Sequence, residues 1–364
     1  MLITFDATPL LGRRTGVGRY VDGVVRELPA ALERRGVTAQ LRATTWTARG
    51  GRLEHLPTGV TQIGPRVPAR LLRECWRRSD VPPIEMLVGR TDVFHATNFV
   101  SPPTRRAREV VMIHDLTYLD HSETVDRESL AYRTLVPRAL DRGAHVVTPS
   151  QTVADAVRAR YGLDPGRVTA TPLGVDPEWF DAQPAAPLWL ESHNLPHDYI
   201  VFVGSIDPRK NLPRLLQAHA LARAELTSVP ELVLAGPAGR ESSLAARPGV
   251  HLTGWLDDVD LRSLVAGSRA LVLPSLDEGF GLPVLEALAA GRPVVTSSVP
   301  ALREVAGPHA EVAEATDVEG LAAALVRGVS GNDDEAEREA RRAWARESTW
   351  ARTADRTVDA YLGS

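Results

Sequence analysis

Two glutamates eight residues apart, Glu278 and Glu286, lie in the segment of this sequence with the richest chemistry, LPSLDEGFGLPVLEA over residues 273–287. Pro283 suits the first turn of a helix, because its missing N–H would be unpaired there anyway. We therefore expect Glu278 in a loop and Glu286 roughly one turn into a helix. Two carboxylates so placed can bind different parts of one polyhydroxylated ligand. The alternative, that both only complement the helix dipole, leaves the two glycines of the segment unexplained.

Two adjacent cations, Arg209 and Lys210, follow another expected strand in the run VGSIDPRKNL over residues 203–212. Arginine as a fork and lysine as a point charge can neutralise a diphosphate without a metal ion. Lys210 is the only lysine among 42 basic residues, which singles out this position. The alternative is an ordinary surface pair flanking a helix start.

A glycine-rich turn, LGRRTGVGRY over residues 11–20, follows the first expected strand and precedes a helical pattern. Glycine lets backbone N–H groups approach a phosphate, and the helix dipole favours its charge. Gly16 could therefore line an anion pocket. The run lacks both the Gly-x-Gly-x-x-Gly pattern and the Gly-Lys-Ser/Thr of a nucleotide-triphosphate loop, so an ordinary turn stays an alternative.

His114 and His95 each follow an expected strand, where histidine can be a base, a sugar-hydroxyl partner or a structural hydrogen bonder. The residues alone favour the structural interpretation for His114, and for His95 a structural or acceptor-lining one. Asp257 and Asp258 precede a helical pattern and are expected to cap it rather than to bind a metal. We expect no metal and no other cofactor.

Short apolar runs that alternate with helical patterns predict the scaffold for these residues, two doubly wound parallel sheets of the α/β class. Ligands of such sheets bind at the carboxyl ends of strands, which makes the cleft between the sheets the expected site. The segment 181–187, with two prolines, is expected to link the domains. The expected strands are 2–5, 92–95, 110–113, 145–148 and 168–171, then 199–203, 232–235, 250–252, 270–273 and 293–296.

The composition argues against several classes of protein. Of the 364 residues 43% are apolar and 24% charged, which is typical of folded proteins, and a lone cysteine, Cys75, rules out an internal disulfide framework. Residues 1–183 carry 25 arginines against 21 acids, a surplus too mild to indicate nucleic-acid binding. No apolar run of about 18 residues occurs. We expect a cytoplasmic protein, and we expect the charge run 332–342 to form a solvated helix.

The segment Glu278 to Glu286 matches the E-x7-E signature, and the sequence resembles the retaining glycosyltransferases of group 1, the fourth sequence family. These enzymes have the GT-B fold of two Rossmann-like domains facing across a cleft, with a C-terminal helix that crosses back to the first domain. The resemblance covers nearly the whole chain. Further landmarks are the Gly16 to Gly18 loop, DVFHATNF at 92–99, IHDL at 113–116, TPS at 148–150, PLGVD at 172–176 and Arg209-Lys210-Asn211.

The resemblance implies roles for the site residues. Glu278 would contact donor-sugar hydroxyls and Glu286 the nucleotide ribose, while Arg209 and Lys210 would grip the diphosphate. His114 would lie at the transfer centre. Many relatives carry an arginine where this sequence has Ser205, so Arg209 is expected to supply that charge. Expected donor contacts are completed by Gly16, Ser205, Gly279, Phe280, Gly281 and Leu282.

The segment 181–187 places the domain boundary near residue 185. The resemblance then implies an acceptor-binding domain, residues 1–184 with 348–364, and a donor-binding domain, residues 185–347. The implied reaction moves a hexose, expected to be mannose from GDP-mannose, to a glycan, lipid-linked or small-molecule hydroxyl with retention and without an essential metal. A nucleotide-sugar hydrolase or epimerase of GT-B type, or a non-catalytic nucleotide-sugar-binding protein, are the alternatives. The acceptor, the linkage, the donor base and the oligomeric state stay open.

An amphipathic pattern over residues 66–78 places Leu71, Leu72, Cys75 and Trp76 on one helical face beside arginines. This pattern is compatible with a peripheral contact at the inner face of a membrane. The alternative, favoured by the residues alone, is a helix that packs on its own domain.

Overall fold

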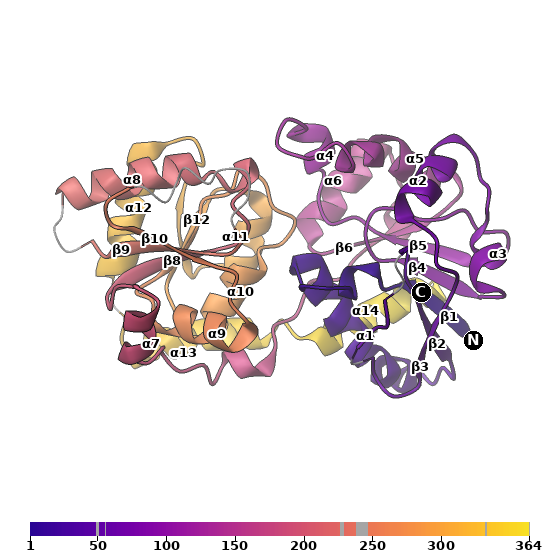
Figure 1. The fold of residues 1–364 in the computed structure, drawn as a ribbon, viewed down its shortest axis with the longest axis horizontal. Coiled ribbons are helices and arrows are strands. Elements are labelled where there is room, and N and C mark those ends of the chain that lie inside the picture. Colours follow the sequence, from indigo (N-terminus) through magenta and orange to yellow (C-terminus); the bar gives the residue numbers. More distant parts are fainter. Residues whose placement is uncertain (49–50, 55, 226–228, 238–246, 332, 364) are drawn as a thin grey trace. The chain divides into compact units, whose positions relative to one another are not determined.

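A computed structural model describes residues 1–364 except 49–50, 55, 226–228, 238–246, 332 and 364 (Figure 1). The chain forms two compact units, residues 1–174 with 349–364 and residues 175–348. Each unit is a parallel sheet with helices between its strands. The α/β class with two doubly wound sheets, predicted from the alternating pattern, is confirmed.

The first unit has a seven-stranded sheet in the order β3-β2-β1-β4-β5-β6-β7, with every neighbouring pair parallel. Its strands are β1 (Leu2–Asp6), β2 (Gln40–Thr44), β3 (Val60–Ile63), β4 (Val93–Ala96), β5 (Arg108–Met112), β6 (His145–Thr148) and β7 (Val168–Ala170). Its helices are α1 (Gly16–Arg34), α2 (Ala69–Arg78), α3 (Ile84–Val88), α4 (Thr117–Asp120), α5 (Tyr132–Asp141), α6 (Gln151–Tyr161) and α14 (Trp350–Leu362), with short 3-10 turns at Thr8–Leu10, Ser129–Ala131 and Pro165–Arg167.

The second unit has a six-stranded sheet in the order β10-β9-β8-β11-β12-β13, again parallel throughout. Its strands are β8 (Tyr199–Val203), β9 (Glu231–Ala235), β10 (Val250–Gly254), β11 (Leu271–Leu273), β12 (Val294–Ser297) and β13 (Ala310–Ala313). Its helices are α7 (Pro187–Ser192), α8 (Leu212–Glu225), α9 (Asp258–Gly267), α10 (Leu282–Ala289), α11 (Pro300–Ala306), α12 (Val318–Ser330) and α13 (Glu335–Arg346), with 3-10 turns at Pro177–Trp179 and Pro208–Lys210.

Three strands escape the sequence pattern. β3 and β13 form outer edges of their sheets, where a strand needs no continuous apolar run, and most of their residues are half-buried or exposed. β2 alternates polar and apolar residues. The strands that the pattern does reveal include central ones such as β8, whose five residues are all buried because helices cover both faces.

The C-terminal helix α14 packs on α1 in the first unit, as the resemblance implied. Arg34 forms an ion pair with Asp355 at 2.9 Å, and Arg35 forms one with Asp359 at 2.8 Å. The indole of Trp350 lies where a side chain on Gly23 would be, only 2.3 Å from an ideal Cβ. This close approach needs glycine at position 23.

The chain passes between the units twice, and both passages lie at one place. Val175 N–H donates to the Ser348 carbonyl at 3.1 Å. A Cβ on Gly174 would lie 2.1 Å from the Trp350 nitrogen, so glycine lets the two chain segments run side by side. The division falls after residue 174, whereas the sequence predicts it after residue 184.

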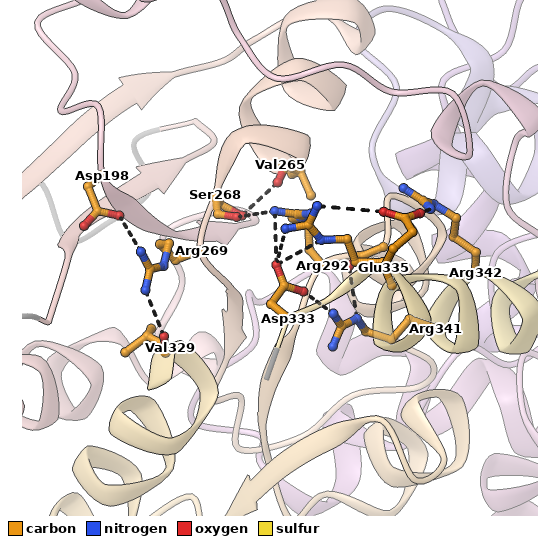
Figure 2. A network of polar contacts seen from close by, with 12 residues as sticks. Asp198, Val265, Ser268, Arg269, Arg292, Val329, Asp333, Glu335, Arg341 and Arg342 are labelled. Atoms are coloured by element: carbon orange, nitrogen blue, oxygen red, sulfur yellow. Dashed lines mark hydrogen bonds and ion pairs between the residues drawn. The ribbon is translucent and has the colours of Figure 1, made fainter. Parts of the chain in front are cut away.

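The charge run near residue 332 forms α13, but the prediction of a solvated helix is wrong for Arg341, which is 6% exposed. Arg341 Nε donates to the Gly291 carbonyl at 3.0 Å and so ties α13 to the end of α10. Its guanidinium also pairs with Asp333, which pairs with Arg338 at 2.9 Å and with Arg292 at 3.8 Å (Figure 2). We call these four residues the Asp333 cluster; residue 332 lies outside the described residues.

Candidate functional site

Two loops at the carboxyl edge of the second sheet carry the main candidate residues. Arg209 and Lys210 belong to the 3-10 turn that follows β8, and Glu278 belongs to the loop that follows β11. Because β8 and β11 are neighbouring parallel strands, their following loops meet at one edge of the sheet. Residues 68 and 69 positions apart in the sequence therefore come into contact.

Glu278 is the centre of this contact. Lys210 Nζ lies 2.5 Å from Glu278 Oε1, and Arg209 Nη1 lies 3.0 Å from Glu278 Oε2. The Ser275 hydroxyl donates to Glu278 Oε1 at 2.7 Å. We call these four residues the Glu278 cluster. The side chains of Glu278 and Lys210 are only 9% and 12% exposed, so solvent screens their pairing weakly.

Opposing effects set the protonation of the cluster. Burial alone would raise the pKa of the Glu278 carboxyl, but Arg209, Lys210 and the Ser275 hydrogen bond outweigh it and lower the pKa to about 2. Burial lowers the pKa of the Lys210 ammonium, while the Glu278 carboxylate opposes that change. The attraction of two cations to one carboxylate keeps Glu278 ionised.

Asn211 holds the two loops together. Its backbone is left-handed, with φ 59°, and its side-chain amide donates to the Pro274 carbonyl at 3.0 Å and to the Ala315 carbonyl at 2.6 Å. Leu276 N–H donates to the Arg209 carbonyl at 2.8 Å. Sequence reasoning assigned no role to Asn211 or Ser275. Signals did exist, because Asn211 follows Lys210 directly and Ser275 precedes Glu278 by three residues.

The helix that follows the Glu278 loop begins as predicted. Gly281 is the N-cap of α10 with φ 103°, and a Cβ there would lie 2.5 Å from Leu302, so this turn needs glycine. Pro283 lies in the first turn, and Glu286 is 4% exposed on the helix. The side chains of Phe280 and Leu282 are buried within the unit.

Ser205 does not join the Glu278 cluster. Its hydroxyl donates to the Asp207 carboxylate two residues away. Arg209 also donates to the Asp277 carbonyl at 2.8 Å in the Glu278 loop, and its compensation for Ser205 stays a prediction.

His114 and Gly16 lie in the first unit. Gly16 is the first residue of α1, after Thr15 as the N-cap, and open space surrounds the position of its missing Cβ. His114 follows β5, and its Nε2 lies 3.0 Å from the Thr97 carbonyl. A carbonyl only accepts, so Nε2 carries the proton, and burial lowers the pKa of the ring. The neutral ring thus leaves Nδ1 as a hydrogen-bond acceptor.

His95 has a structural environment, the interpretation that the sequence favoured. It is 1% exposed, and both ring nitrogens lie within hydrogen-bond distance of tyrosine hydroxyls, those of Tyr20 and Tyr361. Asp257 caps α9 as predicted, since its carboxylate accepts from Asp260 N–H at 2.9 Å. Within the described ranges no group of three or more His, Cys, Asp or Glu residues gathers as metal ligands, and metal independence stays a prediction.

The predicted amphipathic helix is α2, and its apolar residues do not share one environment. Leu72 and Trp76 are buried against their own unit, and the Trp76 indole donates to the Pro82 carbonyl at 2.9 Å. Cys75 is half-buried, whereas Leu71 is 57% exposed. Among the described helices none is long and apolar enough to cross a membrane.

Comparison with known families assigns both units. Residues 14–179 match the family described as Glycosyltransferase Family 4, and residues 197–330 match Glycosyl transferases group 1. The chain belongs to the group 1 glycosyltransferases. Gly16 and His114 lie within the first match, and the Glu278 cluster lies within the second.

Relatives of this glycosyltransferase include mannosyltransferases. It is 27% identical to O-antigen chain mannosyltransferase B of Escherichia coli over 99% of both chains. It is 34% identical to the MMP alpha-(1->4)-mannosyltransferase of Mycolicibacterium hassiacum over 50% of this chain and 44% of that protein. Sucrose-phosphate synthase from Thermosynechococcus elongatus has the same fold, with a TM-score of 0.74 and 19% identity over 99% of this chain and 98% of its own. The GT-B fold is thereby confirmed.

Proposed function

We propose that this glycosyltransferase moves mannose from GDP-mannose to a hydroxyl of a glycan or lipid-linked acceptor and retains the anomeric configuration. The observation that carries the proposal is the Glu278 cluster, in which two cations and a carboxylate share one buried edge of the sheet. Similarity to an O-antigen mannosyltransferase and to an alpha-(1->4)-mannosyltransferase supports mannose as the sugar.

The cations of the cluster suit a diphosphate leaving group. Arg209 and Lys210 place two positive charges beside Glu278, and these charges can attract an arriving anion. An ammonium has three N–H donors, and Glu278 is the partner of Lys210 within the described residues. The remaining donors can meet phosphate oxygens as charge develops on the departing diphosphate. This arrangement supports cleavage without an essential metal.

Glu278 is suited to hold the sugar and poorly suited to attack it. A carboxylate paired with two cations, with a pKa of about 2, is a weak nucleophile and a weak base. Its oxygens can still accept hydrogen bonds from sugar hydroxyls. Retention would then follow a front-face route, in which the departing phosphate helps to deprotonate the acceptor. In the same proposal Glu286 binds the ribose, and the backbone of 279–281 surrounds the donor.

The first unit supplies the remaining proposed contacts. His114 offers Nδ1 as an acceptor for a hydroxyl of the transferred sugar, because its Nε2 proton is already donated to Thr97. Gly16 lets the loop before α1 approach the diphosphate. Residues 1–184 with 348–364 would bind the acceptor and residues 185–347 the donor.

A donor screen tests the proposal. GDP-mannose, UDP-glucose, GDP and UDP are added separately to the protein with EDTA present, and the thermal midpoint is measured, since a ligand of the native state raises it. We expect GDP-mannose and GDP to raise the midpoint. Transfer to synthetic α-mannosyl oligosaccharides then yields a product whose anomeric NMR signals are expected to show an α-linkage.

Four outcomes would contradict the proposal in distinct ways. Stabilisation only by uridine nucleotides would overturn the donor, and a β-linked product would overturn retention. Mannose released at the same rate with and without acceptor would favour the hydrolase alternative. Binding without any turnover would favour the non-catalytic alternative.

A peripheral membrane contact is a separate part of the proposal. Leu71, Val81 and Met86 are 57%, 59% and 64% exposed, and Arg70 and Arg78 beside them are exposed as well. Exposed apolar side chains among arginines suit an anionic lipid surface. We expect the protein to sediment with anionic vesicles at low salt, and we expect a smaller sedimented fraction for Leu71→Ser. If the same fraction of protein sediments with and without vesicles, the proposed membrane contact is wrong.

A further inference from the structure

A buried chain of hydrogen bonds connects the C-terminal helix to the interior of the first unit. The Tyr20 hydroxyl lies 3.2 Å from His95 Nε2, and the Tyr361 hydroxyl lies 2.7 Å from His95 Nδ1. Their exposed fractions are 1% for Tyr20, 1% for His95 and 3% for Tyr361. The three side chains come from α1, β4 and α14, so the fold brings together residues from both ends of the sequence.

The last residue of this hydrogen-bond chain, Tyr20, packs against His114. The Tyr20 ring lies edge-on to the imidazole of His114, with ring centroids 5.5 Å apart and an angle of 84°. Phe99 packs edge-on against the same imidazole at 5.4 Å, and the Thr97 carbonyl accepts from Nε2. Three contacts therefore set the orientation of the His114 ring, and the one made by Tyr20 depends on the hydroxyl that His95 holds.

The groups of the chain are neutral. Burial lowers the pKa of His95 to about 3, so one ring nitrogen donates and the other accepts. Burial raises the pKa of both Tyr20 and Tyr361, so both hydroxyls keep their protons. Phenylalanine and leucine would fill the same space without desolvating polar groups. A set of buried polar side chains whose hydrogen bonds are all satisfied instead fixes the orientation of each side chain.

We propose that Tyr361, acting through His95 and Tyr20, is a positioning residue that holds the His114 imidazole in the orientation needed at the transferred sugar. The inference rests on the proposed function, because only there does His114 contact substrate. It adds that the last turn of α14 takes part in catalysis without touching either substrate.

Tyr361→Phe is the direct test, because it removes one hydroxyl and keeps the ring. Tyr199→Phe is the matched control: Tyr199 is 1% exposed, and its hydroxyl donates to the Leu264 carbonyl at 2.7 Å in the other unit. A misplaced catalytic contact can cost up to about 100-fold in rate. We expect kcat with GDP-mannose to fall about tenfold in Tyr361→Phe with the donor KM within about twofold, and to stay within about twofold in the control.

A second readout needs no substrate. Nitrogen-15 NMR of the free protein reports which ring nitrogen of each histidine is protonated, and we expect Nε2 for His114. Tyr361→Phe should shift the ring signals of both His95 and His114, whereas Tyr199→Phe should shift neither. Unchanged His114 signals in Tyr361→Phe would overturn the positioning role, whatever the kinetics. Full activity of His114→Ala would instead refute the catalytic role of His114 in the proposed function and leave the NMR result intact.

Tyr20→Phe keeps the inference testable if Tyr361→Phe does not fold. It breaks the chain at its other end and is expected to lower kcat by a similar factor. The double variant should be no slower than the slower single variant, because both changes act on one imidazole. If the rate losses of the two single variants multiply in the double variant, the two tyrosines act independently. That result would overturn the proposal that Tyr361 acts through His95 and Tyr20.

Discussion

The second unit contains two clusters in which cationic side chains surround one carboxylate, and they lie at opposite ends of the sheet. The Glu278 cluster follows the carboxyl ends of β8 and β11. The Asp333 cluster gathers near Gly291 and Arg292, which precede β12 (Figure 2). In parallel sheets loops at the carboxyl ends bind ligands, while those at the amino ends chiefly stabilise. We therefore predict that the Glu278 cluster binds a ligand and that the Asp333 cluster stabilises the unit.

Arg341 and Lys210, one cation from each cluster, also differ in their hydrogen bonds to backbone carbonyls. Arg341 Nε donates to the Gly291 carbonyl, and Arg341 Nη2 donates to the Asp333 carboxylate. Arg341 therefore joins α13 to the end of α10. Lys210 meets Glu278 alone within the described residues and ties no backbone carbonyl. Arg341 therefore stabilises the packing of α13, whereas Lys210 is held, among the residues that the structure describes, by a side chain alone. Arg209 combines both kinds of contact, because it also donates to the Asp277 carbonyl.

Lys210→Ala provides the largest expected effect. It should lower kcat by about 100- to 1,000-fold, comparable to the loss of one donor to a developing oxyanion, because the diphosphate loses a charge-assisted partner. Circular dichroism should report a preserved fold. The matched control is Arg338→Ala in the Asp333 cluster, for which turnover of GDP-mannose should stay near that of the wild type. Near-normal turnover in Lys210→Ala would remove Lys210 from the mechanism.

Arg341→Ala should show the reverse behaviour. Removing a buried guanidinium leaves the Gly291 carbonyl without its partner and takes from Asp333 one of its three cations, which should cost about 2–3 kcal/mol in the free energy of unfolding. Denaturant unfolding measures that loss, and kcat at a temperature well below the midpoint should change by less than about threefold. A large fall in kcat with unchanged stability would mean that the Asp333 cluster belongs to the active site.

The sequence predicted the scaffold and the identity of the charged residues better than their pairing. The E-x7-E spacing and the lone lysine indicate Glu278 and Lys210. The sequence predicted that these two side chains bind different parts of a ligand, and it did not predict that they contact each other. Their contact depends on β8 and β11 being neighbours in the sheet, although β9 and β10 separate them in the chain. Strand order is a long-range property that local periodicity does not encode.

The same reason explains why the contacts of Asn211, Tyr20 and Tyr361 were not predicted. The partners of Asn211 include the Ala315 carbonyl, 104 positions away, and those of His95 include Tyr361, 266 positions away. The local sequence around each of these residues does not reveal such distant partners. The burial of Arg341 was missed because a run of charges carries no sign of which member meets a helix end.

Acidification should weaken the Glu278 cluster, because it protonates the Glu278 carboxylate. Its folded pKa of about 2 lies below the model-peptide value of about 4.3, so its contribution to stability is present above that value and is lost as pH falls toward 2. Glu278→Gln removes this contribution at every pH. The difference in unfolding free energy between wild type and Glu278→Gln should therefore shrink between about pH 4.5 and pH 2. A constant difference across that range would mean that the carboxylate is not held by its cations.

Ser275→Ala should give the smallest effect and so measures how much of the cluster is hydrogen bonding rather than charge. The Ser275 hydroxyl is the one neutral donor of the cluster, at 2.7 Å from Glu278 Oε1. Because Lys210 and Arg209 continue to hold the carboxylate, we expect a loss of about 1 kcal/mol or less and a fall in kcat/KM of about threefold to fivefold. Ser297→Ala is the control, since its hydroxyl donates to the Ser275 carbonyl at 2.6 Å and leaves Glu278 untouched. A loss in Ser275→Ala as large as that in Lys210→Ala would show that orientation of the carboxylate, and not the cationic charge beside it, limits the reaction.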